Sequence, residues 1–320
     1  MAFDSSGNLY ASETPLGRVS RINTNGTTTP VLTGLVQPEG VVFDAADNMY
    51  VVEDVDDGRV MKKAAGSGGT TGTEFAGGLN SPEGIIWVDQ GAGILYVTES
   101  NIENTINDPN PQPDAFQTYV TSISSLGVKT RILTTSAVFT PNIPALSAEG
   151  TFWSYTDLVL GSDDLLYLAN ELSGRSISGT IDVPVPPFTV TVDYEANSTG
   201  AVFTTDPAIL STSATEFADD STIAPEGLTF SSNGNFPLYM TEEDISNDQS
   251  GVGRLSRIDA SGNRTDFCTG FSTLEDIVVD ENGWLYVIED LNGIVIQIRS
   301  AAEPEPEVDE YFIWLPLILR

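Results

Sequence analysis

One short pattern recurs six times along this chain. Each copy has a hydrophobic run, a turn rich in Gly and Asn, an aromatic-rich run and then a polar or acidic residue. The aromatic run carries a tyrosine at positions 10, 50, 96, 167, 239 and 286, at intervals of 40, 46, 71, 72 and 47 residues. Such a period is typical of stacked supersecondary units, each of which buries its apolar faces only against a neighbour.

The unit from Pro38 to Ser81 has room for four short strands. We predict strands over 40–44, 49–53, 59–63 and 73–76, with hairpin turns at Asp47-Asn48 and Asp57-Gly58. Amphipathic helices between the strands are not found, and 40% hydrophobic residues exclude a disordered chain. Residues 1–300 are therefore predicted to form an all-β, six-bladed β-propeller of four-stranded antiparallel blades.

The last unit has three recognisable strands, over 277–280, 284–289 and 294–299. An acidic, Pro-rich stretch and an apolar tail follow over 301–320. The tail resembles the short aromatic end of exported proteins of Chloroflexota-type bacteria, or it is an edge strand that fills the open blade, where Pro316 would be tolerated. We also expect a native first strand and a signal peptide upstream of Met1, because the pattern begins just after the position of a first Pro-Glu-Gly.

The charge balance restricts the possible partners. The formal net charge is −33 and the chain has a single cysteine, Cys268, so no intrachain disulfide forms. Strong negative charge argues against nucleic acid or an anionic membrane and favours cations or cationic surfaces. A solvated acidic surface that keeps the protein soluble is the alternative explanation. The composition agrees with an extracellular or cell-surface protein.

Acidic residues are predicted to gather at one end of the ring. If the first strand of each unit runs away from Pro-Glu-Gly and the second runs back, the start of one and the end of the other lie together. Ten carboxylates then surround one mouth of the central channel: Glu13, Glu39, Glu53, Glu83, Glu99, Asp157, Glu226, Glu242, Glu275 and Glu289. Two like charges 4 Å apart cost about 1 kcal/mol in water and about 4 kcal/mol at an effective dielectric of 20. Compensation is expected from backbone N–H groups, arginines, protons or a divalent cation.

A glutamate that recurs in nearly every unit is also typical of a structural contact. Each one can accept hydrogen bonds from the loop of the neighbouring blade. Positions that break the repeat therefore say more about a site, and they gather in the fourth unit. This unit reads Tyr155-Thr156-Asp157 in place of Pro-Glu-Gly, and it has Asn170 before Glu171 where others have Glu.

Several motifs resemble those of known propeller families. Pro-Glu-Gly stands at 38–40, 82–84 and 225–227, followed by Tyr-x-x-Glu strands and by Gly-Arg-Val or Gly-Arg-Leu at 17–19, 58–60 and 253–255. The repeat resembles the six-bladed propellers of the NHL, virginiamycin-B-lyase and gluconolactonase (senescence-marker-protein-like) families over most of the chain. These motifs indicate the fold, while propellers of one scaffold have many activities.

The resemblance to gluconolactonase implies one divalent metal, bound in the channel mouth by a Glu, an Asn and an Asp. Asp157 and Asn170, with one of Glu39, Glu83 or Glu226, supply the same hard-oxygen ligands. Such ligands suit Ca²⁺ or Mg²⁺ rather than zinc.

The chain contains no histidine. The His-dependent chemistry of virginiamycin-B-lyase-like propellers, of paraoxonase-like lactonases and of quinoprotein sugar dehydrogenases is therefore excluded, as is a His-paired serine triad. For an enzyme, metal-polarised hydrolysis with a carboxylate base remains.

Two functions stay open at this point. The first is a secreted, monomeric propeller that binds a divalent cation at the channel mouth and acts as a non-catalytic module for a small molecule, sugar or cationic ligand. The alternative is a metal-dependent lactone or ester hydrolase of gluconolactonase type. Insertions at 101–117 and 172–203 follow second strands and are expected to wall the site. Neither nucleic acid nor a membrane span is expected.

Overall fold

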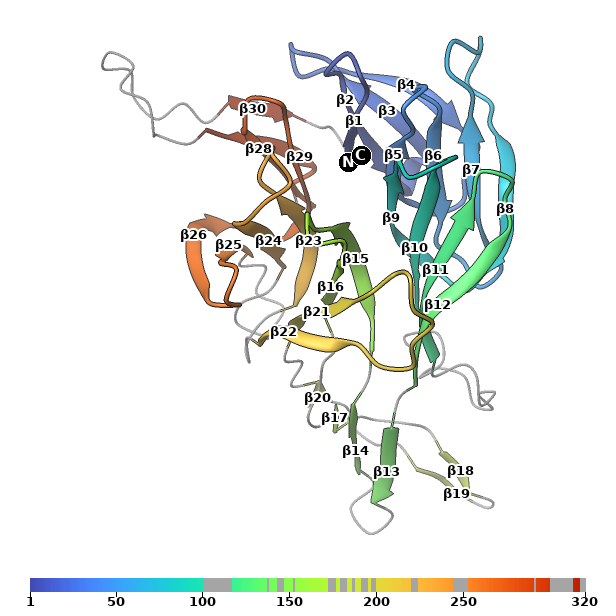
Figure 1. Ribbon diagram of the computed structural model, residues 1–320, viewed down its shortest axis with the longest axis vertical. Helices are drawn as coiled ribbons and strands as arrows, with labels where there is room; N and C mark the ends of the chain where they lie inside the picture. The colour runs from blue at the N-terminus through green and yellow to red at the C-terminus, as the bar shows by residue number, and fades with distance from the viewer. Residues whose placement is uncertain are drawn as a thin grey trace.

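The computed structural model is a ring of six four-stranded antiparallel sheets, a six-bladed β-propeller (Figure 1). The predicted all-β class and the four-stranded blades are confirmed. The structure describes residues 1–100, 117–136, 138–142, 147–151, 153–171, 177–178, 183–185, 188–190, 195–196, 200–219, 224–243, 253–290, 292–299 and 313–316. First strands of neighbouring blades contact one another, as β5 does β9 and β23 does β27, so the first strand of each blade is innermost.

The first three blades follow the chain directly. Blade one has β1 (Ala2–Phe3), β2 (Leu9–Glu13), β3 (Arg18–Ile22) and β4 (Thr28–Thr33), with a short 3-10 turn, η1 (Thr14–Leu16), between β2 and β3. Blade two has β5 (Pro38–Phe43), β6 (Met49–Glu53), β7 (Gly58–Lys63) and β8 (Thr73–Leu79). Blade three has β9 (Pro82–Val88), β10 (Ile94–Glu99), β11 (Gln117–Ser124) and β12 (Lys129–Ser136).

The other three blades complete the ring. Blade four has β15 (Tyr155–Leu160), β16 (Leu166–Asn170), β21 (Ala201–Thr205) and β22 (Thr215–Asp219). Blade five has β23 (Pro225–Phe230), β24 (Leu238–Glu242), β25 (Gly253–Ile258) and β26 (Arg264–Phe271). Blade six has β27 (Leu274–Val279), β28 (Leu285–Glu289), β29 (Ile294–Ile298) and β30 (Ile313–Pro316). We call the end of the ring where first strands begin and second strands end the mouth.

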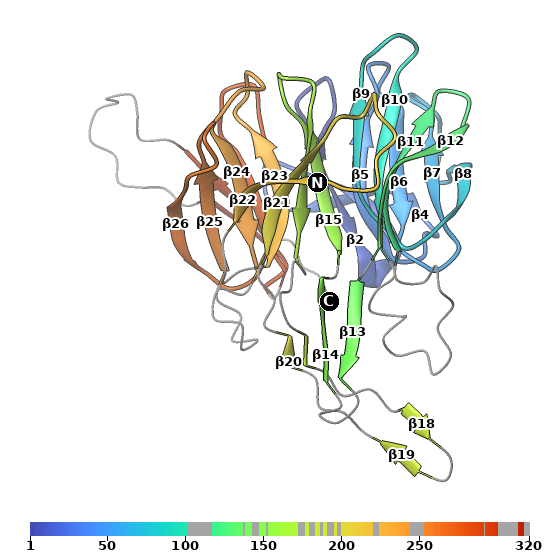
Figure 2. The ribbon, with the colours of Figure 1, turned by 60° about the horizontal axis from the view of Figure 1, so that its bottom comes forward.

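Further strands lie outside the blades. A small antiparallel sheet contains β13 (Val138–Asn142), β14 (Ser147–Thr151), β17 (Ile177–Ser178) and β20 (Glu195–Ala196), and β18 (Val183–Val185) pairs with β19 (Phe188–Val190). These segments leave the ring after β12 and after β16, both at the mouth (Figure 2). The insertion predicted at 172–203 therefore contains strands that the sequence pattern did not predict. Residues 101–116 of the other insertion lie outside the described residues.

The repeated Asp and Tyr form the hairpin between the first two strands. In blade two, Asp44 Oδ1 accepts the backbone N–H groups of Ala46 and Asn48, each at 2.9 Å. Asp44 Oδ2 accepts the Asn48 amide at 2.7 Å and the Tyr50 hydroxyl at 3.1 Å. Asp4 and Asp280 make the same contacts with Tyr10 and Tyr286. This Asx-turn explains why the tyrosine recurs six residues after the aspartate.

Six apolar clusters lie between successive blades. The cluster between blades six and one contains Leu9, Ala11, Ile288 and Val295, and Phe3 packs edge-on against Tyr286 with ring centroids 5.2 Å apart. The ring is thus closed by side-chain packing. The tail has the edge-strand arrangement, because β30 pairs antiparallel with β29 and Pro316 lies opposite Ile294.

The glycine of Pro-Glu-Gly lets neighbouring inner strands approach closely. A Cβ on Gly40 would lie 2.5 Å from the Glu83 carbonyl oxygen, and one on Gly84 would lie 2.8 Å from Asp157 Cα. Backbone atoms cannot rotate away as a side chain can, so the motif is set by the packing of blade on blade.

Replacing this glycine tests the packing argument. Gly40→Ala should lower the free energy of unfolding by about 1 to 3 kcal/mol, because the added methyl group overpacks the contact between β5 and β9. Gly68→Ala is the matched control, since a Cβ at Gly68 meets no atom within 4 Å. Urea denaturation measures both, and equal stability of the two variants would contradict the argument.

Candidate functional site

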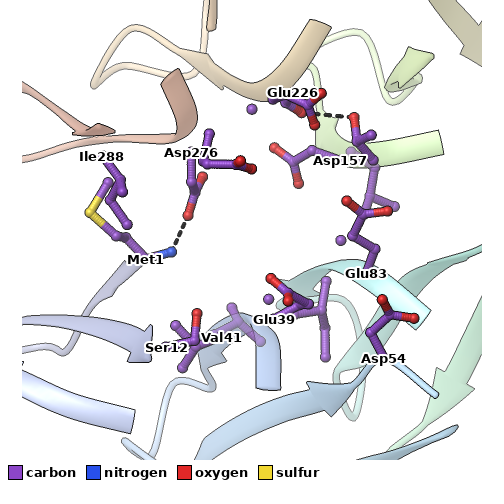
Figure 3. A pocket seen from close by; sticks show the side chains of 18 of the residues that line it. Met1, Ser12, Glu39, Val41, Asp54, Glu83, Asp157, Glu226, Asp276 and Ile288 are labelled. Carbon is purple, nitrogen blue, oxygen red and sulfur yellow. Dashed lines mark hydrogen bonds and ion pairs between the residues drawn. The ribbon is translucent and has the colours of Figure 1, made fainter. Parts of the chain in front are cut away.

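A cavity of about 1230 Å³ occupies the centre of the ring and is lined by residues of all six blades. In the close view, Glu39, Asp54, Glu83, Asp157, Glu226 and Asp276 surround an open space (Figure 3). The six inner strands supply most of the wall, because they converge on the axis. The cavity is therefore where the repeat places equivalent residues of different blades opposite one another.

The lining is strongly acidic. Twelve carboxylates line the cavity, and the described lining residues include no arginine, lysine or histidine: Glu39, Asp54, Asp56, Asp57, Glu83, Asp157, Glu171, Glu226, Glu243, Glu275, Asp276 and Asp290. Five of the predicted site residues belong to this set, namely Glu39, Glu83, Asp157, Glu226 and Glu275. The expected gathering of carboxylates at the mouth is thus present with a different membership.

The glutamates of the inner strands form one level of the wall. Glu39, Glu83, Glu226 and Glu275 are the second residues of β5, β9, β23 and β27, and Thr156 takes this place in blade four. Thr156 donates its hydroxyl to the carbonyl oxygens of Pro225 and Glu226, both at 3.0 Å. Thr14 donates to Glu39 at 3.1 Å.

A second acidic level was missed by the sequence analysis. It consists of residues directly after the second strand, where Asp54, Glu171, Glu243 and Asp290 line the cavity together with Thr14 and Ser100. Successive residues of an extended chain point to opposite sides. The residue after each strand-end glutamate therefore faces the channel when the glutamate itself faces away. That alternation was the signal in the sequence that could have found this level.

The strand-end glutamates do not line the cavity. They are Glu13, Glu53, Glu99, Glu242 and Glu289, all at most 4% exposed, and three of them bind the linkers between blades. Glu53 accepts the Val36 N–H at 2.9 Å, Glu99 accepts the Asn80 N–H at 2.8 Å, and Glu289 accepts the Ser272 N–H at 2.9 Å. These residues end the second strands at the mouth, but the prediction that their side chains surround the channel was wrong. The alternative, hydrogen bonds to the neighbouring blade's loop, is what the structure has for Glu53, Glu99 and Glu289.

Arginines neutralise several of these buried glutamates. Arg18 pairs with Glu13 at 2.7 Å, Arg59 with Glu53, and Arg254 with Glu242. The Gly-Arg pair at the start of the third strand thus supplies the charge that compensates the acid at the end of the second. This explains why the two motifs recur together.

Asn170 has the same structural role and does not reach the cavity. It ends β16, is fully buried, and accepts the Ser154 N–H on its Oδ1 at 2.7 Å. In blade four, Ala201 lies opposite Asn170, where blades one, two and five have an arginine opposite their strand-end glutamate, so the neutral amide of Asn170 leaves no buried charge to compensate. The predicted pairing of Asn170 with Asp157 as metal ligands is not what this geometry provides.

Asp157 stands at the position of the Pro-Glu-Gly glycine. Its Oδ2 accepts the Leu228 N–H from the next blade at 2.8 Å. Asp276 holds the equivalent position in blade six and contacts the Met1 amino group, which corresponds to the Leu228 nitrogen in the repeat. Both aspartates therefore replace a close backbone contact with a hydrogen bond and still line the cavity.

Burial raises the pKa values of the inner carboxylates. Desolvation, with the negative charge of Asp54, raises the pKa of Glu39 to about 7. Desolvation, with the charge of Asp276, raises the pKa of Asp157 to about 8. Desolvation, with Glu243 and Asp290, raises the pKa of Glu275 to about 8. The pKa values of Glu83 and Glu226 are also raised well above 4.5 by burial and by neighbouring acids.

The oxygen ligands are chemically suited to Ca²⁺ or Mg²⁺, but they stand apart around the wall. Within the described residues, no three acidic, cysteine or histidine side chains are grouped closely enough to hold a metal ion as placed. The ligand set implied by the gluconolactonase resemblance is therefore not preassembled in this conformation.

Known structures share this architecture. A gluconolactonase from Xanthomonas campestris has a TM-score of 0.58 and 17% identity, covering 89% of this chain and 80% of its own. A virginiamycin B lyase from Staphylococcus aureus has a TM-score of 0.54 and 14% identity, covering 99% and 83%. A streptogramin B lyase has a TM-score of 0.52 and 12% identity, covering 98% and 80%.

The likeness is one of fold. It agrees with the six-bladed propeller expected from the repeat, and at these identities it does not transfer an activity. No protein-family model matches the sequence, and no curated protein matches it either. Among the described residues, no helix is long and apolar enough to cross a membrane.

The raised pKa values predict a pH dependence of stability. The folded protein binds protons up to about pH 8 that the unfolded chain releases near pH 4.5, so the free energy of unfolding should fall as the pH rises between these values. Melting temperatures from pH 5 to 8.5, without divalent cations, measure this fall. The triple variant Glu83→Gln/Glu226→Gln/Glu275→Gln should flatten the profile, whereas the surface control Glu216→Gln/Glu281→Gln should keep it. Equal slopes for the two variants would contradict the assignment.

Scaffold and cavity glutamates should respond oppositely to substitution. Glu99→Ala leaves the Asn80 N–H without its acceptor and opens a void, so it should cost about 3 kcal/mol of stability. Glu226→Gln removes a charge that burial disfavours and should raise the melting temperature at pH 8. Thermal unfolding of the two single variants decides this, and a destabilised Glu226→Gln would assign Glu226 to the scaffold.

Proposed function

We propose that this propeller is a non-catalytic binding module whose acidic channel mouth binds cations. The observation that carries the proposal is Glu226, which is only 7% exposed and lines the cavity, and whose carboxylate has no hydrogen bond or ion pair within the described part of the chain. A buried carboxylate without a partner is unfavourable when ionised. A bound positive charge would supply the partner that the protein does not.

Neighbouring carboxylates strengthen this argument. The carboxylates of Glu83 and Glu275 also lack hydrogen bonds and ion pairs to described residues, and the charges of Glu171, Glu275 and Glu83 act on Glu226. Each ionised carboxylate makes the next one harder to ionise, and a cation reverses this effect for all of them at once. Cation binding is thus coupled to deprotonation of the cavity.

Ca²⁺ and Mg²⁺ belong to the cations that we expect to bind. Glu83, Glu226 and Asp157, with Glu39 or Glu275, would have to rotate toward one another to share an ion. Weak binding with dissociation constants of about 10⁻⁴ to 10⁻³ M is typical of extracellular calcium modules. We place the protein in such an environment, outside the cell or at its surface.

A hydrolase remains the second candidate because of Glu39. Its pKa of about 7 suits a general base at neutral pH. The lyase reaction of the structural relatives is a poorer model. A catalytically inactive form of the Staphylococcus aureus virginiamycin B lyase differs by one histidine-to-alanine change, and this chain has no histidine. Hydrolysis of a lactone or ester panel that is lost in Glu39→Gln would favour the enzyme.

Cation binding is tested by thermal shift. Millimolar Ca²⁺ should raise the melting temperature at pH 7.5, and the gain should disappear at pH 5, where the cavity is protonated. The triple variant Glu83→Gln/Glu226→Gln/Glu275→Gln should lose most of the gain, whereas Glu216→Gln/Glu281→Gln, with two exposed acids removed, should keep it. Isothermal titration with Ca²⁺ and with organic ammonium ions measures the affinity directly, and no binding of any cation would refute the function.

A further inference from the structure

The cavity changes character within a few residues of its acidic level. One position of the inner strand, three residues after the glutamate, lines the cavity in all six blades. The residues at this position are Val42, Ile86, Thr229 and Val278, with Val159 and Ala2 at the same place in blades four and one. Five of them are aliphatic and one is a threonine. The channel therefore has an acidic mouth and, toward the far ends of the inner strands, an apolar zone, which we call the waist and define by these six residues.

The two zones lie along one axis. Residues of a strand advance about 3.3 Å each, so the level of Val42 lies about 10 Å along β5 from Glu39. Between them, Asp157 and Asp276 are the deepest charges on the inner strands, one residue beyond the glutamate level. A ligand that fills both zones must have a positive end and an apolar end.

A metal ion alone would leave the waist unused. Within the described residues, no three carboxylates converge on a point, so the negative charge is spread around the wall. Carboxylates that are spread around a wall suit an ammonium group, because it can donate three hydrogen bonds in different directions to different carboxylates. The waist offers methyl and methylene surface to the remainder of such a molecule.

We infer that the ligand class of this channel is an aliphatic amine, with its ammonium group among Glu83, Glu226 and Glu275 and its hydrocarbon chain in the waist. This inference rests on the proposed function, because it requires that the mouth binds cations. The buried and unpartnered Glu226 carboxylate is the contact that fixes the ammonium end. The half-buried side chains of Val42, Val159 and Val278 would contact the hydrocarbon chain of the amine.

Isothermal titration of the full chain at pH 7.5 with straight-chain amines tests the inference. Methylamine, butylamine and hexylamine should bind with increasing affinity, by up to about fourfold for each fully buried methylene. Hexanol should not bind detectably, because it lacks the charge. Calcium chloride serves as the cation without an apolar part.

Two exchanges between blades provide matched variants. Val159→Thr introduces the residue that blade five has at this position, and Thr229→Val does the reverse, so both side chains are compatible with the fold. Val159→Thr should lower the gain per methylene about twofold or more, and Thr229→Val should increase it. Neither should alter calcium affinity, whereas Glu226→Gln should weaken every cation.

The outcomes separate the inference from the function. If calcium and methylamine bind but affinity does not rise with chain length, the amine inference is wrong and the cation-binding function stands. If hexanol binds as well as hexylamine, the waist acts without the mouth and the inference is wrong. If no cation binds, both the inference and the function are wrong.

Discussion

Blade-on-blade packing is the constraint from which the other features follow. A four-stranded sheet of this kind has two apolar faces, and each is covered only by the next blade, from the cluster around Val19 and Val51 to the closure around Leu9 and Val295. Six inner strands then meet at one axis, and the glycines at 40, 84 and 227 let their backbones touch. A polar residue at a channel-facing position of the repeat therefore recurs in several blades around the channel.

The repeat supplies acid near the start of the first strand and at the end of the second strand, and the two positions differ in how the charge is compensated. Three of the strand-end glutamates each accept one linker N–H, and in several blades the glutamate pairs with arginine. In blade four, where Ala201 lies opposite, the acceptor is the neutral Asn170. Among the described residues, the carboxylates of Glu83 and Glu226 have no such partners, and burial raises their pKa values. Glutamate is thus a structural residue at the end of the second strand and is available to a ligand near the start of the first strand.

The sequence pattern was sufficient to predict the blades, because hydrophobic alternation, Asx-turns and the Tyr period are local signals. It was also sufficient to place Glu39, Glu83 and Glu226 at one end of the ring. It failed where one residue decides between two sides of a strand, so that Glu53 was predicted in the channel and Asp54 was overlooked. It failed again at Asn170, because the Ser154 N–H that binds its side chain belongs to a linker whose position depends on the tertiary structure. The small sheet of β13, β14, β17 and β20 lies in segments without the repeat, where no period could reveal it.

The central claim is that the cavity carboxylates need a cation to ionise. Counting the protons released on cation binding tests it most directly, by titrating Ca²⁺ and hexylamine at pH 7 in buffers of different ionisation enthalpy. The account predicts a clear net release of protons, because a bound cation lowers the raised pKa values, which are about 7 for Glu39 and about 8 for Asp157 and Glu275. Binding heats that are identical in all buffers, with no proton released, would contradict it.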